Sequence, residues 1–279
     1  MAYAETYLGS TAVILHVEPG IVLKHPHDRA TQELNDESAV KFDIERQIFE
    51  LLGEHPRIVR YLGWQDATPD QQPGFLLAEA SPGNLGVYLY KNHDAIPLSL
   101  RKKWCRQAIE SIVYLHQKGV IHCDIRPDNM LIYTTTSTTP PSLDLCLCDF
   151  GGSECEKLGL SNPNLPDAGF YNPNSGTEKS RNTDIFAMGS VLYTILTGHW
   201  PYREPAAGFF ESLAAMDAYM NMVDGFFEKR EFPDVTGIWA GDVIRKCWME
   251  EYASAEDALQ HINEFFNGDT TYEHVCYID

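Results

Sequence analysis

Three polar residues stand where their side chains could bind a hard cation. Asp124 and Asn129 lie in VIHCDIRPDNMLI (120–132), a polar turn between two apolar runs, and Asp149 ends the apolar run of LCLCDFGG (145–152). Carboxylate and amide oxygens are the ligands that Mg²⁺ prefers, and a nucleotide phosphate would bring that cation. Either aspartate alone fits equally well a turn residue that accepts hydrogen bonds from nearby backbone amides. The pattern therefore indicates a cation site provided that the fold brings the three residues together.

The elements that must position these residues change in character along the chain. The first 80 residues combine strand-like runs with one helical stripe that has apolar residues at 40, 44, 48, 51 and 52. Strands are predicted at 11–17, 21–24, 57–64 and 74–80, and helices at 37–52, 99–119 and 183–198. The predicted fold class is α+β, with a small β-rich lobe over 1–80 and a larger, mostly helical lobe over 81–267.

Two segments lack the composition of a packed core. TTTSTTPPS (134–142) is polar and rich in proline, so we expect it to be a loop inserted between two short strands. The residues after Asn267 show no periodicity, and 268–279 are interpreted as a tail. The turn-rich segment ASPGNLG (80–86) is the expected link between the two lobes.

The chain is strongly acidic, because its 279 residues include 40 acidic and 21 basic side chains and carry a formal net charge of −19. This charge repels phosphate backbones and anionic lipids, so we expect neither nucleic acid nor a membrane as a partner. No apolar run approaches the roughly 20 residues that span a bilayer, and the first residues do not resemble a secretory signal. We therefore expect a soluble, intracellular, cytoplasmic protein whose seven cysteines are reduced.

Asp124, Asn129 and Asp149 lie in two segments that match motifs of the eukaryotic protein kinase family. The catalytic-loop pattern H-R-D-x-x-x-x-N is present as HCD (122–124) through Asn129, and D-F-G is present at 149–151. The sequence resembles this family over about residues 5–266, which implies a single bilobal kinase domain (5–267) that uses ATP and Mg²⁺. By this resemblance, Asp124 would accept the proton of the attacking hydroxyl, and Asn129 and Asp149 would hold the metal ions.

Three more charged residues follow from the resemblance. Lys24 ends the strand IVLK as the family's phosphate-binding lysine does, and Glu45 lies on the next helix, where its partner glutamate belongs. Taken from the residues alone, Glu45 could instead pair with Lys41 on an exposed helix face. Arg126 stands where serine/threonine kinases have a lysine, and its charge can steady the transferred phosphate. With Pro127 beside it, the loop resembles the serine/threonine class.

The resemblance also implies where the nucleotide binds. FLLAEASPG resembles the strand and hinge beside the adenine, which would be held by backbone groups of Glu79 and Ser81, with Ala78 at the gatekeeper position. Val13 and Val22 would form the roof of the pocket and Leu131 its floor. The remaining candidates for this site are Gly9 of the glycine-rich loop and Cys148, which directly precedes Asp149.

Four aromatic residues could connect the two lobes. Phe49 lies one helical turn after Glu45, and with Tyr61, His122 and Phe150 it could form the apolar stack found in active kinases. Each of these rings is also an ordinary core residue.

The sequence departs from the family pattern at three places. Gly9 is the one confident glycine of the glycine-rich loop, and Cys123 replaces the arginine that meets an activation-loop phosphate in the family. The A-P-E position reads NPN (172–174), and the arginine that pairs with its glutamate is also missing. Asp184, in contrast, matches the family's helix aspartate that braces the catalytic loop.

Three functions are compatible with this pattern. The first is an active serine/threonine protein kinase with a protein substrate, for which the acidic charge favours a basic one. The second is a kinase-fold enzyme that phosphorylates the hydroxyl group of a small molecule, and the third is a pseudokinase that binds nucleotide and serves as an interaction module. The sequence predicts no particular oligomeric state.

Overall fold

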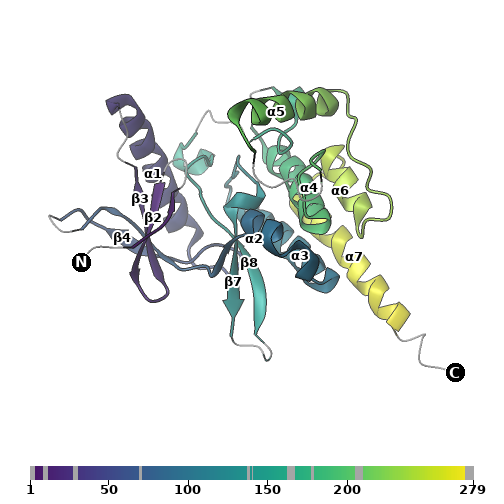
Figure 1. Cartoon of the computed structure of the whole chain (residues 1–279), viewed down its shortest axis with the longest axis horizontal. Helices are drawn as coiled ribbons and strands as arrows, with labels where there is room; N and C mark the ends of the chain where they lie inside the picture. The colour runs from purple at the N-terminus through teal and green to yellow at the C-terminus, as the bar shows by residue number, and fades with distance from the viewer. Residues whose placement is uncertain are drawn as a thin grey trace.

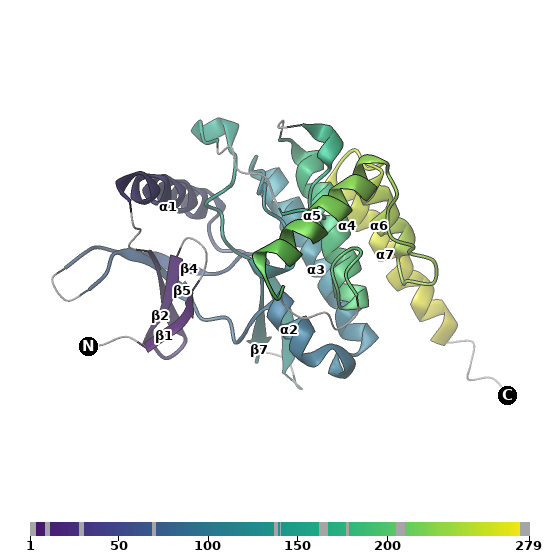
Figure 2. The same cartoon turned by 45° about the horizontal axis from the view of Figure 1, so that its top comes forward.

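A small β-rich lobe and a larger helical lobe make up the protein (Figure 1). The computed structural model describes residues 4–8, 12–27, 31–68, 71–136, 139, 141–161, 167–176, 179–204 and 210–273. The predicted α+β, bilobal architecture is confirmed: one sheet and one long helix form the first lobe, and helices dominate the second (Figure 2).

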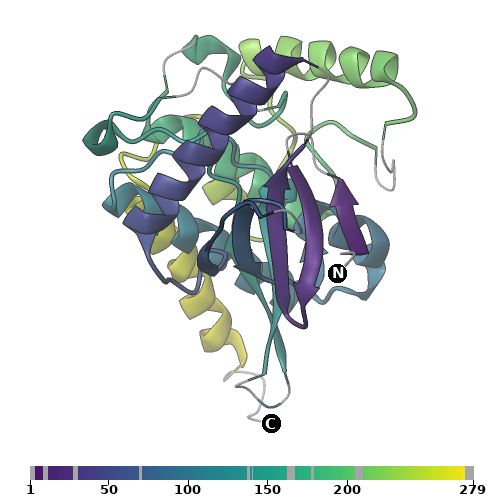
Figure 3. The same cartoon turned by 90° about the vertical axis from the view of Figure 1, so that its left-hand side faces the viewer.

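The first lobe is built on an antiparallel sheet, which faces the viewer in Figure 3. Its five strands follow the order β1-β2-β3-β5-β4. The strands are β1 (Ala4–Leu8), β2 (Ala12–Glu18), β3 (Ile21–Pro26), β4 (Tyr61–Gln65) and β5 (Gly74–Ala78). The central strand β3 carries Lys24, whose neighbours in register are Ile14 on β2 and Phe75 on β5. Because β3 is paired with a strand on each side, the backbone of Lys24 is held in place.

Helix α1 (Gln32–Leu52) packs its apolar stripe toward the core of this lobe. Ile48, Phe49 and Leu52 are buried on that stripe. The helix begins five residues before the predicted start at 37, because the Thr31 side chain accepts a hydrogen bond from the Leu34 amide (3.4 Å) and caps the first turn.

The second lobe consists of six α-helices and a three-stranded sheet within the described residues. The helices are α2 (Leu85–Asn92), α3 (Leu98–Gln117), α4 (Arg181–Thr197), α5 (Leu213–Glu228), α6 (Gly241–Trp248) and α7 (Ala255–Glu273). The sheet is formed by β6 (Pro82–Asn84), β7 (Met130–Thr135) and β8 (Ser142–Leu147). Helix α4 is buried along most of its length, and α3 and α6 pack against it. The loop that carries Asp124 therefore rests on a rigid apolar base.

The predicted strand at 57–64 is divided between the two lobes. Only its second half forms β4, while Ile58 pairs with Leu147 of β8 in a parallel bridge. The Arg57 carbonyl accepts from the Leu147 amide (2.9 Å), and the Val59 amide donates to the Leu147 carbonyl (2.9 Å). This bridge connects the first lobe to β8, the strand that leads to Asp149.

The predicted loop, tail and reduced cysteines can also be compared with the structure. The predicted loop 134–142 is too long, because β7 extends to Thr135 and β8 begins at Ser142, where the two residues pair. Part of the connection between the strands lies outside the described residues. Helix α7 continues to Glu273 and so enters the segment interpreted as a tail. The six cysteines within the described residues are free thiols, and no helix there is long and apolar enough to cross a membrane.

Candidate active site

Lys24 lies between two carboxylates that come from different lobes. Its Nζ is 2.7 Å from Glu45 Oε2 and 2.9 Å from Asp149 Oδ1. Lys24 and Glu45 are 7% and 2% exposed, whereas the Asp149 side chain is 41% exposed. Glu45 thus lies on the buried face of α1 and contacts Lys24, not Lys41. The contacts bring β3, α1 and the segment after β8 to one point.

The protonation of these three groups reflects a balance between burial and neighbouring charge. Burial acts to lower the pKa of Lys24, but the two carboxylates outweigh it and raise the pKa above its usual value. Burial raises the pKa of the Glu45 carboxyl to about 7, against the opposing charge of Lys24. Burial also acts to raise the pKa of Asp149, but Lys24 lowers it overall. Asp149 is therefore an anion at neutral pH, as a cation ligand must be.

Asp124 and Asn129 lie together in a tight turn. The Asn129 amide nitrogen donates to the Asp124 carbonyl (2.8 Å) and to Asp124 Oδ2 (2.9 Å). A short 3-10 turn, Pro127–Asn129, creates this proximity. Burial raises the pKa of Asp124, and the nearby Arg126 guanidinium partly offsets that rise. A carboxylate fixed in this way is suited to accept a proton from a bound hydroxyl.

Arg126 connects Asp124 to a partner that sequence reasoning did not identify. Its Nε is 3.8 Å from Asp124 Oδ2, and its Nη1 contacts Asp167 Oδ2. Asp167 lies in an irregular segment far along the chain, so no periodicity or motif indicated the contact. Burial opposes the charge on Arg126, but the neighbouring aspartates outweigh it and raise the pKa of the guanidinium.

The buried side chain of Asp184 holds the loop that carries Asp124. Its two oxygens accept hydrogen bonds from the backbone amides of His122 (2.8 Å) and Cys123 (2.9 Å), and one of them also contacts His116 Nε2 (3.0 Å). Cys123 has a φ of +66°, a conformation that is costly for a residue other than glycine. The Asp184 carboxylate helps to hold the backbone in this conformation just before Asp124.

The four aromatic residues singled out in the sequence form a continuous stack between the lobes. Phe49 packs against Tyr61 (ring centroids 5.0 Å apart) and edge-on against Phe150 (5.2 Å). Phe150 in turn contacts His122 (5.2 Å). Since each such contact contributes about 0.5–1.5 kcal/mol beyond area burial, the stack stabilises α1 and Asp149 in register with the Asp124 loop.

The residues expected around an adenine lie at the edge of the core. Val22, Leu131 and Cys148 are partly exposed apolar side chains packed against it, and Val13 and Ala78 lie on β2 and β5. The Glu79 amide donates to the Gly20 carbonyl (2.8 Å), and the Ser81 carbonyl accepts from Thr134 Oγ1 (3.4 Å). Gly9 lies outside the described residues, between β1 and β2.

Cys148 is a protonated thiol. Burial raises its pKa well above the usual value, and its Sγ donates to the Asn129 carbonyl (3.3 Å). The thiolate is the reactive form of cysteine, so this environment suppresses reactivity. Cys148 contributes apolar surface to the site.

Hydrogen bonds occupy the NPN position, where the family has a charged pair. Asn172 Nδ2 donates to Glu250 Oε2 (2.9 Å). Asn174 Nδ2 donates to the carbonyls of Phe227 (3.4 Å) and Glu228 (3.2 Å) at the carboxyl end of α5. Sequence reasoning missed these contacts, because side-chain amides in loops carry no periodic signal.

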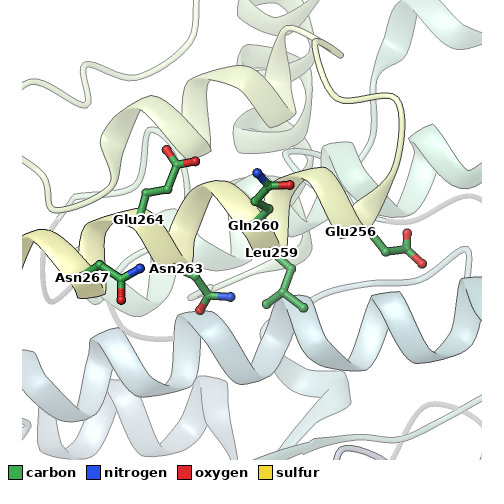
Figure 4. A pocket seen from close by; sticks show the side chains of 6 residues that line it. All are labelled: Glu256, Leu259, Gln260, Asn263, Glu264 and Asn267. Carbon is green, nitrogen blue, oxygen red and sulfur yellow. The ribbon is translucent and has the colours of Figure 1, made fainter.

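A separate surface hollow of about 500 Å³ runs along α7 (Figure 4). All of its lining residues come from that one helix: Glu256, Leu259, Gln260, Asn263, Glu264 and Asn267. It includes none of the residues described above, so it takes no part in their chemistry.

Known proteins match most of the chain. Residues 20–262 match the family model described as Protein kinase domain. Serine/threonine-protein kinase WNK2 of Mus musculus is 28% identical over 251 residues, which cover 85% of this chain and 11% of that protein. Probable serine/threonine-protein kinase gdt8 of Dictyostelium discoideum is 27% identical over 226 residues, or 78% of this chain and 16% of that protein. The chain thus spans less than a fifth of the length of either relative.

Proposed function

The chain belongs to the protein kinase family, and from this premise we propose that it transfers the γ-phosphate of ATP to a hydroxyl group of a protein, as a serine/threonine kinase. The observation that carries the proposal is the contact of Lys24 with both Glu45 and Asp149, close to a loop in which Asp124 and Asn129 are hydrogen-bonded. These are the polar groups that phosphoryl transfer requires.

The donor atoms fit a nucleotide that arrives with Mg²⁺. Asp149 is an anion with a partly exposed side chain, and Asn129 donates through its amide nitrogen, so its oxygen is the atom suited to a hard cation. We infer that these two residues hold the metal, while Val13, Val22, Ala78 and Leu131 contact the base. Mg²⁺ held by Asn129 and Asp149 would supply positive charge beside the phosphates.

The mechanism follows from what each side chain can do. Glu45 aims the Lys24 ammonium, which binds the α- and β-phosphates, and burial strengthens this electrostatic contact. Asp124 accepts the proton of the substrate hydroxyl as the hydroxyl oxygen attacks the γ-phosphorus, and the bond from that phosphorus to the β–γ bridging oxygen breaks to release ADP. Arg126, held beside Asp124 by Asp167, presents positive charge to the transferred phosphate.

A protein substrate with basic residues is the expected partner, because the chain carries a net charge of −19. The second candidate function is nucleotide binding without turnover, and the specific observation that favours it is the glycine-rich loop with its single confident glycine, Gly9. Phosphorylation of a small molecule remains the alternative within the enzyme class.

The test is ADP release from Mg²⁺-ATP with a basic protein substrate, comparing the wild type with Asp124→Asn. The asparagine keeps the size of the side chain and loses the base, so we expect turnover to fall about a hundredfold or more. Nucleotide affinity of both proteins, measured by thermal shift, is the control and should be equal. Equal turnover in the two proteins refutes the role of Asp124, and nucleotide binding without turnover in the wild type supports the second candidate.

A further inference from the structure

The segment that follows Asp149-Phe-Gly is fastened to the strand-like residues just before the catalytic loop. The Glu154 amide donates to the Ile121 carbonyl (2.8 Å), and the Ile121 amide donates to the Glu154 carbonyl (2.9 Å). Ser153 Oγ donates to the His122 carbonyl (3.3 Å). The backbone of Glu154 is therefore coupled to a residue only three positions before Asp124.

The side chain of Glu154 reaches two other parts of the same segment. Its Oε1 accepts a hydrogen bond from Ser161 Oγ (3.2 Å) and is 3.8 Å from Lys179 Nζ. Between Glu154 and Ser161 the chain forms a closed turn, in which Cys155 and Leu160 exchange two backbone hydrogen bonds of 3.0 Å. The Glu154 carboxylate thus contacts Ser161, which follows this turn, and Lys179, which lies just before α4.

Lys179 lies where a nearby negative charge stabilises it. The lysine side chain is 3% exposed, and it directly precedes Ser180, the N-cap of α4. A helix amino terminus carries partial positive charge and disfavours a cation, and a buried ammonium is costly without a counter-charge. Glu154 supplies such a charge at a place where the adjacent Cys123 thiol is neutral, since burial raises its pKa.

We propose that Glu154 and Lys179 are positioning residues, whose ion pair holds residues 154–161 and the start of α4 against the loop that carries Asp124. The pair joins the residues before α4 to Glu154, and the backbone of Glu154 passes this restraint to Ile121. The restraint then comes from an internal carboxylate, so we expect turnover that does not require phosphorylation of this chain. This inference rests on the proposed phosphotransfer function.

The test uses the full chain and five variants. Glu154→Gln and Lys179→Met each remove one charge, their combination removes both, and Glu156→Gln and Lys157→Met alter exposed residues of the adjacent turn as matched controls. Hydrogen exchange of the 155–161 backbone, measured without nucleotide, reports the restraint. Turnover and the KM for ATP are measured before and after phosphatase treatment.

We expect the single-charge variants to exchange this backbone about tenfold faster than the wild type and to lose about tenfold in kcat, with the KM for ATP changed less than about twofold. The double variant should recover part of both losses, because the two charges interact and removing both costs less than the sum of the two single removals. The controls should match the wild type, and phosphatase treatment should leave wild-type turnover unchanged.

Three results would overturn the inference: wild-type exchange in both single variants, a double variant whose losses equal or exceed the sum of the two single losses, or loss of wild-type turnover after phosphatase treatment. If a single variant fails to fold, Ser161→Ala tests the same point, since it weakens one contact of Glu154 without isolating a charge. An inactive wild type whose exchange responds as expected refutes phosphotransfer and retains the ion-pair restraint, so the two failures are distinguishable.

Discussion

Replacing Glu45 with glutamine keeps the shape of the side chain and removes its charge from Lys24. Glu45 supplies two of the three carboxylate contacts to the ammonium, at 2.7 and 2.9 Å, while Asp149 supplies the third at 2.9 Å. In the variant, we expect the Lys24 ammonium to interact more strongly with Asp149. Mg²⁺ also needs this carboxylate as a ligand. Both groups are then less able to bind nucleotide.

The size of the effect follows from these contacts. A hydrogen bond to a charged group contributes about 1.5–3 kcal/mol, and the glutamine can replace only part of one. We therefore expect a loss of about 2 kcal/mol in the binding of Mg²⁺-ATP, which corresponds to roughly a thirtyfold weaker affinity. Glu37→Gln, an exposed position on the same helix, is the matched control and should bind as the wild type does.

The assay is a fluorescence titration with a nucleotide analogue at a pH well above 7, the approximate pKa of Glu45, so that the carboxylate is charged. The titration is repeated in a Lys24→Met background. If Glu45 acts through Lys24, its replacement should have almost no further effect once the lysine is gone. An equal loss of affinity in both backgrounds refutes the reasoning. So does an unchanged affinity of Glu45→Gln alone.

Two further predictions concern pH and the buried Asp184. Burial raises the pKa of Glu45 to about 7 from 4.5, so its contribution to stability is present in full below pH 4.5 and is lost as pH rises to about 7. We therefore expect the free energy of unfolding of the wild type to fall relative to that of Glu45→Gln over this range, as measured by urea titration. A difference between the two proteins that stays constant with pH contradicts this prediction. Asp184→Asn should cost about 2–3 kcal/mol in the same measurement, because its amide group cannot accept from both His122 and Cys123; an unchanged unfolding midpoint argues against the brace.

Residues that lie close together in the sequence were the easiest to predict. Asp124 and Asn129 share one turn, and Asp149 follows an apolar run, so their types and spacing already indicated an oxygen-rich cluster. The helix that carries Glu45 followed from apolar periodicity. The strand that carries Lys24 followed from its β-rich composition and from the turn before it. Periodicity alone did not decide between Lys24 and Lys41 as the partner of Glu45, because that depends on which face of α1 is buried.

Boundaries and cross-chain pairings were harder to predict. The start of α1 depends on the Thr31 cap, a single hydrogen bond outside the apolar stripe. Ile58 reads as part of a continuous strand, yet it pairs with Leu147 in the other lobe. The contact between Arg126 and Asp167 joins two irregular segments, and only the folded backbone brings them together.

The NPN turn shows why a departure from a family motif need not weaken the fold. A buried ion pair stabilises the fold only if the attraction between its charges exceeds the free-energy cost of desolvating both. Replacing the whole pair by neutral groups can therefore have almost no effect on stability. Here Asn174 donates to the carbonyls that end α5, and Asn172 donates to Glu250. The turn remains anchored on two sides with one charge in place of two. The segment before α4 therefore keeps a fixed end, against which the ion pair of Glu154 and Lys179 can act.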